Sequence, residues 1–362
     1  MRVHFDDQVF TSQRRGGISR YFVELIRHLN QDSALDTEVD LGWRWIRNEH
    51  ALEANLGREL RIMGGGRRLV LRTANRLVSS SSGPVDVTHL TGYSRAYLAR
   101  RRGHRTAVTV VDMTPELFPD LFPRGSPHSG KADVVRQADI VICISESTRR
   151  DLIDVFGPIA SPIAVTPLGV GSQFKPDAAR ILRLAAPYLL FVGTREGYKD
   201  FGVALAAFAQ LSNRRPELTL AAVGAGPFDD SERDMIRRWG LGTRVIQINA
   251  SDGELPGAYA GAAAFVFPSR YEGFGLPTVE AMASGAPTVL ADTSSHPEVG
   301  GDAVRYFPAG DAVGLSEQLE RILDDGALRA DLIAKGILRA AMFSWHRTAT
   351  LTAQAYRIAE GT

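Results

Sequence analysis

The stretch Pro268-Ser-Arg-Tyr-Glu-Gly-Phe-Gly-Leu-Pro-Thr-Val-Glu-Ala-Met-Ala-Ser-Gly-Ala-Pro287 decides the fold of this chain. It follows the short apolar run Ala264–Phe267, which predicts a buried strand. Its second half, Leu276–Ser284, has the pattern of a helix. A strand, a loop and a helix in this order are typical of one unit of a parallel α/β sheet.

The loop and helix of this stretch carry groups suited to a phosphorylated sugar ligand. Glu272 lies in the loop and Glu280 stands eight residues later on the helix. Gly275 leaves room for a ligand at the backbone, and the amides of Phe274, Gly275 and Leu276 at a helix N-terminus favour an anion. Glu280 can reach both hydroxyls of a diol with its two oxygens. The combination predicts a site for a sugar joined to a nucleotide diphosphate.

Outward from this stretch, apolar runs alternate with helical patterns in two successive series. The first predicted strands are Val3–Phe5, Val85–Leu90, Ala107–Val111, Ile140–Ile144 and Ile163–Val165, with helices at 18–29 and 145–156. The predicted strands of the second series are Tyr188–Val192, Leu218–Val223, Arg244–Ile248, Ala264–Phe267 and Pro287–Ala291, with predicted helices at 201–211, 231–239, 276–284 and 311–323. Two such series predict two Rossmann-like, doubly wound α/β domains. The Gly- and Pro-rich stretch Pro167–Pro176 predicts the hinge between them.

The stretch from Pro268 to Pro287 resembles the paired-glutamate motif of the family 4 retaining glycosyltransferases, which have the GT-B fold. By this resemblance, Glu280 holds the ribose hydroxyls and Glu272 holds hydroxyls of the donor sugar, with help from the amides of Phe274–Leu276. The alternative is a plain strand, loop and helix with surface acids. The resemblance implies that a hexosyl-type sugar moves from a nucleotide-diphosphate donor to an acceptor hydroxyl. Bacterial polysaccharide, lipopolysaccharide or glycolipid assembly is the expected setting, with a glycan or lipid-linked acceptor.

The same resemblance predicts which domain binds the donor and which binds the acceptor. Residues 1–170 form an acceptor-side domain and residues 171–343 a nucleotide-sugar-binding domain, facing each other across a cleft. Residues 344–362 form a C-terminal helix that packs back on the first domain.

Two cations follow the strand Tyr188–Val192 at the start of the second series. Arg195 and Lys199 stand four residues apart, just after Gly193, and lysine occurs only four times in the chain. Two positive charges here can neutralise a leaving diphosphate, and the family has a matching Arg and Lys in that role. The alternative is a surface ion pair with Glu196 or Asp200.

A glycine pair near the N-terminus, Gly16-Gly17, follows the first predicted strand and opens a helix. Such a pair suits a phosphate-facing turn, although most glycine pairs are ordinary turns. In the family a Gly-Gly loop at this place faces the donor phosphate and sugar, which implies a donor-binding role for Gly16 and Gly17.

A fourth element, at the end of the strand Ala107–Val111, departs from the family pattern. Many members have His-Asp at this strand end, with the histidine on the donor sugar, whereas here Val111 precedes Asp112. Asp112 is retained as a site residue. His89 ends the neighbouring predicted strand, where it either lines the same cleft or is a satisfied histidine of the core or rim.

The mechanism that the resemblance implies is front-face substitution without a metal ion. There is no Asp-X-Asp motif for a metal-bound diphosphate and no cysteine–histidine cluster for zinc, so we expect no cofactor. A dehydrogenase is the weaker alternative, because Val223-Gly-Ala-Gly-Pro227 lacks the third glycine of the dinucleotide fingerprint. A non-catalytic nucleotide-sugar-binding or assembly protein is the second alternative.

Composition and charge limit the other classes of protein that this chain could belong to. The formal net charge of +1 gives no general attraction to nucleic acid, and the single cysteine, Cys143, sits in an apolar run typical of a buried thiol. No signal peptide or membrane span is apparent, so we expect a cytoplasmic protein, or one peripheral to the inner face of the cell membrane. Residues 58–105 hold 11 arginines against two acids, with Arg68, Arg72 and Arg76 at helical spacing. They form either a solvated helix face or a surface for an anionic membrane or acceptor.

Overall fold

The computed structural model describes residues 1–60, 67–78, 84–100, 105–122, 128–182, 184, 187–195 and 197–360, without the side chains of 67, 68, 72, 76–78, 359 and 360. The chain divides into two compact units. Unit 1 contains Met1–Gly169 and Trp345–Thr362, and unit 2 contains Val170–Ser344. The divisions fall next to the boundaries that the sequence placed at 170 and 343, and each unit is described here by itself.

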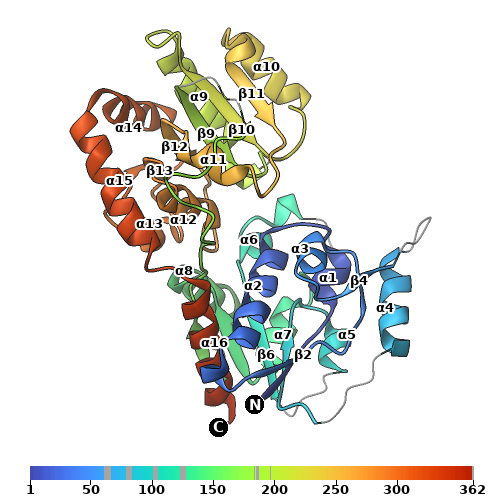
Figure 1. The fold of residues 1–362 in the computed structure, drawn as a ribbon. Coiled ribbons are helices and arrows are strands. Elements are labelled where there is room, and N and C mark those ends of the chain that lie inside the picture. Colours follow the sequence, from blue (N-terminus) through green and yellow to red (C-terminus); the bar gives the residue numbers. More distant parts are fainter. Residues whose placement is uncertain are drawn as a thin grey trace. The chain divides into compact units, whose positions relative to one another are not determined.

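Unit 1 is built on a parallel sheet of six strands in the order β2-β1-β5-β6-β7-β8 (Figure 1). The strands are β1 (Arg2–Phe5), β2 (Glu38–Asp40), β5 (Val87–Leu90), β6 (Arg105–Val110), β7 (Ile140–Cys143) and β8 (Ile163–Val165). β5 and β7 are buried along their whole length, which explains the continuous apolar sequence of β7. A second sheet pairs β3 (Trp45–Ile46) with β4 (Arg58–Glu59). The sequence did not predict β2, β3 or β4, because two or three half-exposed residues leave no apolar run to recognise.

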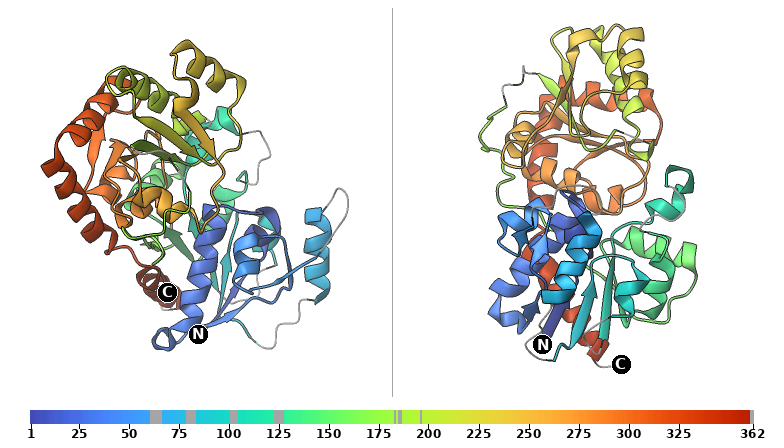
Figure 2. Two further views of the ribbon diagram at one scale, coloured as in Figure 1. Left: turned by 45° about the horizontal axis from the view of Figure 1, so that its top comes forward. Right: turned by 90° about the vertical axis from the view of Figure 1, so that its right-hand side faces the viewer.

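Helices flank the sheet of unit 1 (Figure 2). They are α1 (Gln8–Ser12), α2 (Gly17–Gln31), α3 (Glu49–Glu53), α4 (Arg67–Val78), α5 (Arg95–Leu98), α6 (Thr114–Leu117), α7 (Lys131–Gln137), α8 (Glu146–Phe156) and α16 (Trp345–Glu360), with 3-10 turns η1 (Ser33–Leu35) and η2 (Pro119–Leu121). Ser145 caps α8, since its hydroxyl accepts from the Thr148 amide at 2.9 Å. The last helix, α16, packs against α2 and β7, so the C-terminus completes the first unit (Figure 1).

Unit 2 holds a second parallel six-stranded sheet in the order β11-β10-β9-β12-β13-β14. Its strands are β9 (Tyr188–Val192), β10 (Thr219–Val223), β11 (Val245–Ile248), β12 (Ala264–Phe267), β13 (Thr288–Ala291) and β14 (Arg305–Phe307). Counted within the unit, this is the order 3-2-1-4-5-6 of a doubly wound nucleotide-binding sheet. The order reverses between β9 and β12, and ligands of such sheets bind at the carboxyl ends of the strands beside this reversal.

The helices of unit 2 cover both faces of its sheet. They are α9 (Phe201–Ser212), α10 (Asp230–Arg238), α11 (Leu255–Ala260), α12 (Leu276–Ala283), α13 (His296–Gly300), α14 (Ala312–Asp324) and α15 (Gly326–Ala340), with 3-10 turns η3 (Gly197–Lys199) and η4 (Gly242–Arg244). α9 and α14 pack together over one face, where Phe191, Phe201 and Phe208 are fully or almost fully buried in the core. α12 packs against α15. The sequence predicted every strand of this sheet except β14.

Candidate active site

Lys199 and Glu272, predicted from separate motifs, meet at the reversal point of the unit 2 sheet. Lys199 ends the turn after β9, and Glu272 lies in the loop after β12. The Lys199 Nζ donates to Glu272 Oε1 at 2.6 Å, and the two side chains are 15% and 10% exposed. The ammonium also lies 5.0 Å from the ring centre of Tyr198 and 5.5 Å from that of Phe267. A cation and a carboxylate are therefore held together, partly open, where a ligand of this sheet type binds.

Backbone contacts fix the loop that carries Glu272. The Arg270 amide donates to the Tyr198 carbonyl at 2.8 Å, which joins the loops after β12 and β9. The loop after β13 supports it from the other side: Ser294 Oγ accepts from the Glu272 amide at 2.9 Å, and Ser295 Oγ donates to the Glu272 carbonyl at 2.9 Å. Both backbone groups of Glu272 are thus satisfied, which sets the direction of its side chain.

The start of α12 has the geometry expected of an anion-facing helix end. Gly275 is the N-cap with φ +88°, a conformation that side chains other than glycine rarely adopt, and no side chain caps the helix. The Phe274 ring is buried against Phe343 at 5.5 Å, and Leu276 begins the helix half-buried. The anchored ring therefore holds in place the loop whose amides at Phe274, Gly275 and Leu276 were expected to face the donor.

Glu280 lies on α12 and is 3% exposed. The Tyr259 hydroxyl of α11 donates to its Oε2 at 3.2 Å. Tyr259 is itself buried and packs against Phe174 and Phe265. This contact orients the carboxylate, as is required of a group that has to hold a diol with both oxygens.

Arg195 does not take the position that the sequence predicted, and the expected contact with a leaving diphosphate is corrected. Its Nε and Nη2 donate to the carboxylate of Glu232 at 2.8 and 3.2 Å, and its Nη atoms donate to three carbonyls, those of Gly224, Gly226 and Pro227. The guanidinium lies 4.8 Å from the Phe228 ring centre, and the side chain is 3% exposed. Arg195 instead holds the loop after β10, because its donors are turned inward.

Two glycines bring the backbones of neighbouring loops together beside this arginine. A Cβ on Gly224, where φ is +102°, would lie 3.0 Å from the Gly193 carbonyl oxygen. Gly193, with φ +140°, would meet nothing within 4 Å, so the space over it is open. Gly193 therefore keeps its expected place at the carboxyl end of β9, with room for a ligand at its backbone.

Gly16 and Gly17 lie at the N-terminus of α2 in unit 1. Gly16 is the N-cap without a side-chain cap, and Gly17 is exposed. The helix runs for 15 residues, so its first amides present a dipole end of ordinary strength. The placement agrees with the predicted turn.

His89 is a core histidine, which corrects its inclusion among the site residues. It is 0% exposed, and its Nδ1 lies 2.6 Å from the Tyr356 hydroxyl and its Nε2 2.8 Å from Thr109 Oγ1. Burial lowers the pKa of His89 to about 3, so the ring is neutral. The ring therefore joins α16, through Tyr356, to the neighbouring strand β6, through Thr109.

Asp112 lies half-buried after β6, where its Oδ1 accepts from the Thr114 amide at 3.0 Å. It thereby shapes the start of α6, and its carbonyl accepts from Lys131 Nζ at 2.9 Å. Val111, the residue that departs from the family pattern, lines a cavity in unit 1, whereas Asp112 is not part of the lining. No direct chemical role for Asp112 follows from these contacts.

Sequence reasoning missed His296 and the serines before it. His296 is fully buried at the start of α13, with Nδ1 2.8 Å from the Ala291 carbonyl and its ring 5.3 Å from that of Phe267. Because a carbonyl only accepts, Nδ1 carries the proton, and Nε2 has no hydrogen-bond partner. Burial lowers the pKa of His296. The sequence did offer a signal for these residues. They are polar and directly follow the predicted strand Pro287–Ala291, just as Glu272 follows the predicted strand Ala264–Phe267.

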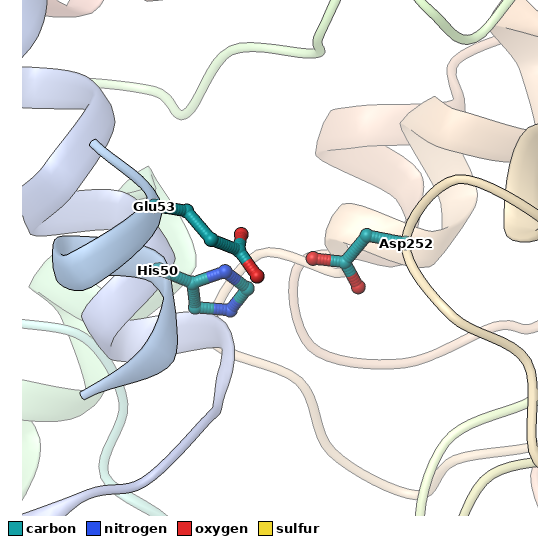
Figure 3. Close-up of side chains that lie close together, drawn as sticks. All are labelled: His50, Glu53 and Asp252. Carbon is teal, nitrogen blue, oxygen red and sulfur yellow. The ribbon is translucent and has the colours of Figure 1, made fainter. Parts of the chain in front are cut away.

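Figure 3 shows three residues that bear on metal binding. His50 and Glu53 belong to α3 of unit 1, and Asp252 belongs to unit 2. Since the positions of the units relative to one another are not determined, we assign no site to these residues.

Within the described part of the chain, no helix is long and apolar enough to cross a membrane. Cys143 is buried, as expected, and burial raises its pKa to about 12.

Comparisons with known proteins agree with this geometry. Residues 177–339 match the family described as glycosyl transferases group 1, and residues 15–174 match glycosyltransferase family 4. The O-antigen chain mannosyltransferase B of Escherichia coli is 33% identical over 280 residues, covering 72% of each chain. A glycogen synthase of Mycobacterium tuberculosis is 33% identical over 243 residues, covering 64% of this chain and 57% of the relative.

Solved structures share the fold over the whole chain. Sucrose-phosphate synthase from Thermosynechococcus elongatus superposes with a TM-score of 0.77 at 21% identity, covering 100% of this chain and 99% of that one. Anabaena HepE, in complex with UDP and glucose, gives 0.74 at 19% identity, covering 98% of each. These neighbours establish the GT-B fold. The chain belongs to the glycosyltransferases of family 4.

Proposed function

We propose that this enzyme is a retaining hexosyltransferase that moves a sugar from a nucleotide-diphosphate donor to an acceptor hydroxyl during glycan assembly. The observation that carries the proposal is the Lys199–Glu272 pair at the reversal point of the unit 2 sheet. A nucleotide site of this sheet type lies beside that point. The relatives named mannosyltransferase and glycogen synthase support a hexose, and the UDP and glucose held by HepE support a nucleotide-sugar donor.

Each group has a distinct role in this proposal. Glu280 holds the ribose hydroxyls, and the α12 amides near Gly275 hold phosphate oxygens. Lys199 neutralises the diphosphate as it leaves, and Glu272 holds hydroxyls of the donor sugar. When the donor binds, the ammonium and the carboxylate that now pair with each other turn to these ligand groups, so neither charge is left buried alone.

The reaction is front-face substitution. The acceptor oxygen bonds to the anomeric carbon on the side from which the diphosphate leaves, while the bond from that carbon to the phosphate oxygen breaks. The acceptor proton passes to the departing phosphate oxygen, so no protein base is needed. Positioning and charge stabilisation then carry the rate enhancement.

We expect no metal requirement, because the ammonium of Lys199 supplies the charge that a divalent ion would otherwise supply. Turnover in excess chelator should equal turnover in added magnesium or manganese. Strict dependence on either metal would refute this part of the proposal.

The proposal is tested by a screen of nucleotide sugars and their nucleoside diphosphates for stabilisation of the protein. A ligand at 100 times its dissociation constant adds roughly 2.7 kcal/mol to stability. The hit is then incubated with sugar acceptors, and NMR determines the anomeric configuration of the product. A product with inverted configuration would exclude the retaining mechanism. Donor binding without transfer or hydrolysis would favour the non-catalytic alternative.

We also propose that α4 helps the enzyme to associate with anionic membranes. Leu69 and Val70 on this helix are 68% and 43% exposed, and the sequence surrounds them with Arg68, Arg72 and Arg76, whose side chains lie outside the described part. Apolar side chains beside arginines are typical of an interfacial helix.

A further inference from the structure

The loop that joins β13 to α13 in unit 2, here called the β13 loop, contacts the neighbouring loop that carries Glu272. β12 and β13 are adjacent parallel strands, so the loops at their carboxyl ends emerge side by side (Figure 1). Thr293 Oγ1 of the β13 loop donates to the Arg270 carbonyl at 3.1 Å. Ser294 Oγ accepts from the Glu272 amide and Ser295 Oγ donates to the Glu272 carbonyl, both at 2.9 Å. The backbone position of Glu272 therefore depends on three consecutive hydroxyl side chains of the β13 loop.

Ser294 has a backbone conformation that serine rarely adopts. Its φ is +48°, in the left-handed region where a side chain crowds the backbone and glycine is preferred. The residue is half-buried, and among the described residues its hydroxyl bonds to the Glu272 amide. A serine at this position therefore costs backbone free energy that glycine would not cost, and it supplies Glu272 with a hydrogen-bond acceptor that glycine lacks.

The β13 loop is itself fixed to the core of unit 2. His296 directly follows the loop, and its ring, which donates to the Ala291 carbonyl at 2.8 Å, lies 5.3 Å from the ring of Phe267. The Thr293 amide donates to the same Ala291 carbonyl at 2.9 Å. Because Phe267 is the last residue of β12, one anchor serves both loops. The hydroxyl of the β13 loop thus gives the Glu272 amide an acceptor in a fixed position.

The position of the Glu272 amide bears directly on the carboxylate of the same residue. The amide nitrogen is bonded to the Cα that carries this side chain, so a rotation of the backbone turns the carboxylate. The carboxylate accepts from Lys199 Nζ at 2.6 Å, and its direction therefore also affects the ammonium. In a reacting complex, a displacement of about 1 Å can lower the rate by roughly 10²-fold. The acceptor that Ser294 supplies is thus placed to affect turnover through Glu272.

We propose that Ser294 is a positioning residue for sugar transfer, which fixes the Glu272 carboxylate by accepting a hydrogen bond from the Glu272 backbone amide. The inference rests on the proposed function, in which Glu272 holds hydroxyls of the donor sugar. Its consequence is that stability and turnover respond in opposite directions to changes at residue 294, because the side chain that strains the backbone also positions the carboxylate.

The experiment compares substitutions that separate the hydroxyl from the backbone strain. Ser294→Gly removes the hydroxyl and relieves the strain. Ser294→Thr keeps a hydroxyl and adds strain, because a β-branched residue fits a positive φ poorly. Asn55→Gly is the matched control, since Asn55 is an exposed residue of unit 1 with φ +57°.

Four measurements on the full chain are needed for each variant. Initial rates give kcat and the donor KM, and calorimetry gives the affinity for UDP and GDP. Thermal unfolding gives the stability, and amide hydrogen exchange followed by NMR gives the protection of the Glu272 amide. Each substitution at residue 294 is also made in Glu272→Ala enzyme, which lacks the carboxylate that Ser294 positions.

Ser294→Gly should lower kcat roughly tenfold, leave nucleotide affinity within about twofold and speed exchange of the Glu272 amide at least about tenfold. Its thermal midpoint should stay within about 3 °C of wild type, because the relieved strain offsets the lost hydrogen bond. Ser294→Thr should keep kcat within about threefold of wild type while its thermal midpoint falls. In Glu272→Ala enzyme, Ser294→Gly should lower kcat no further, since the two residues act as one unit. Asn55→Gly should match wild type in turnover.

Three results overturn the inference while the proposed function stands. They are wild-type turnover in Ser294→Gly, a further loss of turnover when Ser294→Gly is added to Glu272→Ala, and a Ser294→Thr enzyme no more active than Ser294→Gly. If Glu272→Ala alone keeps its turnover, or the wild type transfers no sugar, the proposed function fails. Exchange of the Glu272 amide then still decides whether Ser294 fixes that residue.

Discussion

Two cation–glutamate pairs of unit 2 have cations four residues apart in one loop, yet they differ in depth and in surroundings. Arg195 and Glu232 are 3% and 9% exposed, and the arginine also donates to three backbone carbonyls. Lys199 and Glu272 are 15% and 10% exposed, at the open end of β9 and β12. The first pair holds a loop together, whereas in the proposed function the second exchanges its partner for a ligand. Spacing in the sequence is therefore no guide to which of two cations does chemistry.

The largest expected effect is a loss of protein stability when the Arg195–Glu232 pair is broken. Arg195→Ala removes the cation that pairs with the Glu232 carboxylate and the donors to three backbone carbonyls, and breaking a buried pair in this way costs about 3–5 kcal/mol. Urea unfolding of the variant should show this loss. Replacing both partners, as in Arg195→Met with Glu232→Leu, should recover much of it, because no unpaired charge remains. An Arg195→Ala protein as stable as wild type would place Arg195 back among the ligand-binding residues.

Breaking the Lys199–Glu272 pair should affect turnover more than stability. Lys199→Ala should lower kcat by roughly 10²–10³, the usual effect of removing one group that stabilises developing charge. Its unfolding free energy should fall by less than that of the Arg195→Ala variant, because Lys199 donates to one carboxylate, whereas Arg195 donates to a carboxylate and to three backbone carbonyls. Lys199→Arg, which keeps the charge, provides the control for position. If Lys199→Ala loses stability and keeps its turnover, the two pairs do not differ in the way described.

Glu280 extends the comparison to a buried carboxylate that accepts a hydrogen bond from a tyrosine hydroxyl. Glu280→Ala should weaken binding of the nucleoside diphosphate by roughly 1.5–3 kcal/mol, because charge-assisted hydrogen bonds to the ribose are lost. Calorimetry measures this directly, and Glu280→Gln keeps the shape while removing the charge. An unchanged affinity in both variants would remove Glu280 from the nucleotide site.

Asp6 in unit 1 extends the comparison to a buried carboxylate held by neutral donors alone. Gln8 and Thr91 donate to it, and burial raises the pKa of Asp6 from 3.8 to about 6. Since the folded state holds this proton more tightly than the unfolded state, stability should fall as pH rises from about 4 to 6. The slope of one proton is about 1.4 kcal/mol per pH unit. Asp6→Asn should remove this component, and an identical pH profile in that variant would show that folding does not raise the pKa of Asp6.

The smallest expected effect of a single residue is that of each α4 arginine on the free energy of binding to an anionic membrane. At an anionic membrane each contributes about 1 kcal/mol, and this falls off within a Debye length. Arg68, Arg72 and Arg76 changed together to alanine should reduce co-sedimentation with anionic vesicles at low salt. Neutral vesicles and high salt provide the controls. Equal sedimentation with both vesicle types would leave α4 a solvated helix.

The sequence by itself determined the two α/β units, the place of the unit 2 strands, and the loops that carry Lys199, Glu272, Gly275 and Glu280. Buried parallel strands leave continuous apolar runs, and glycines with paired acids mark the loops at their carboxyl ends, so both signals are local. Short half-exposed strands such as β2 (Glu38–Asp40) leave no such run.

Only the tertiary structure decided which partner each polar side chain meets. His89 and Val111 both lie at the carboxyl ends of neighbouring strands, yet Tyr356 of the last helix covers His89, whereas Val111 lines the cavity. Arg195 turned inward because Glu232 and the loop after β10 stand beside it, residues that lie 29 to 37 positions further along the chain. Hydrogen-bond partners and burial arise from segments distant in sequence, and a local pattern carries no information about them.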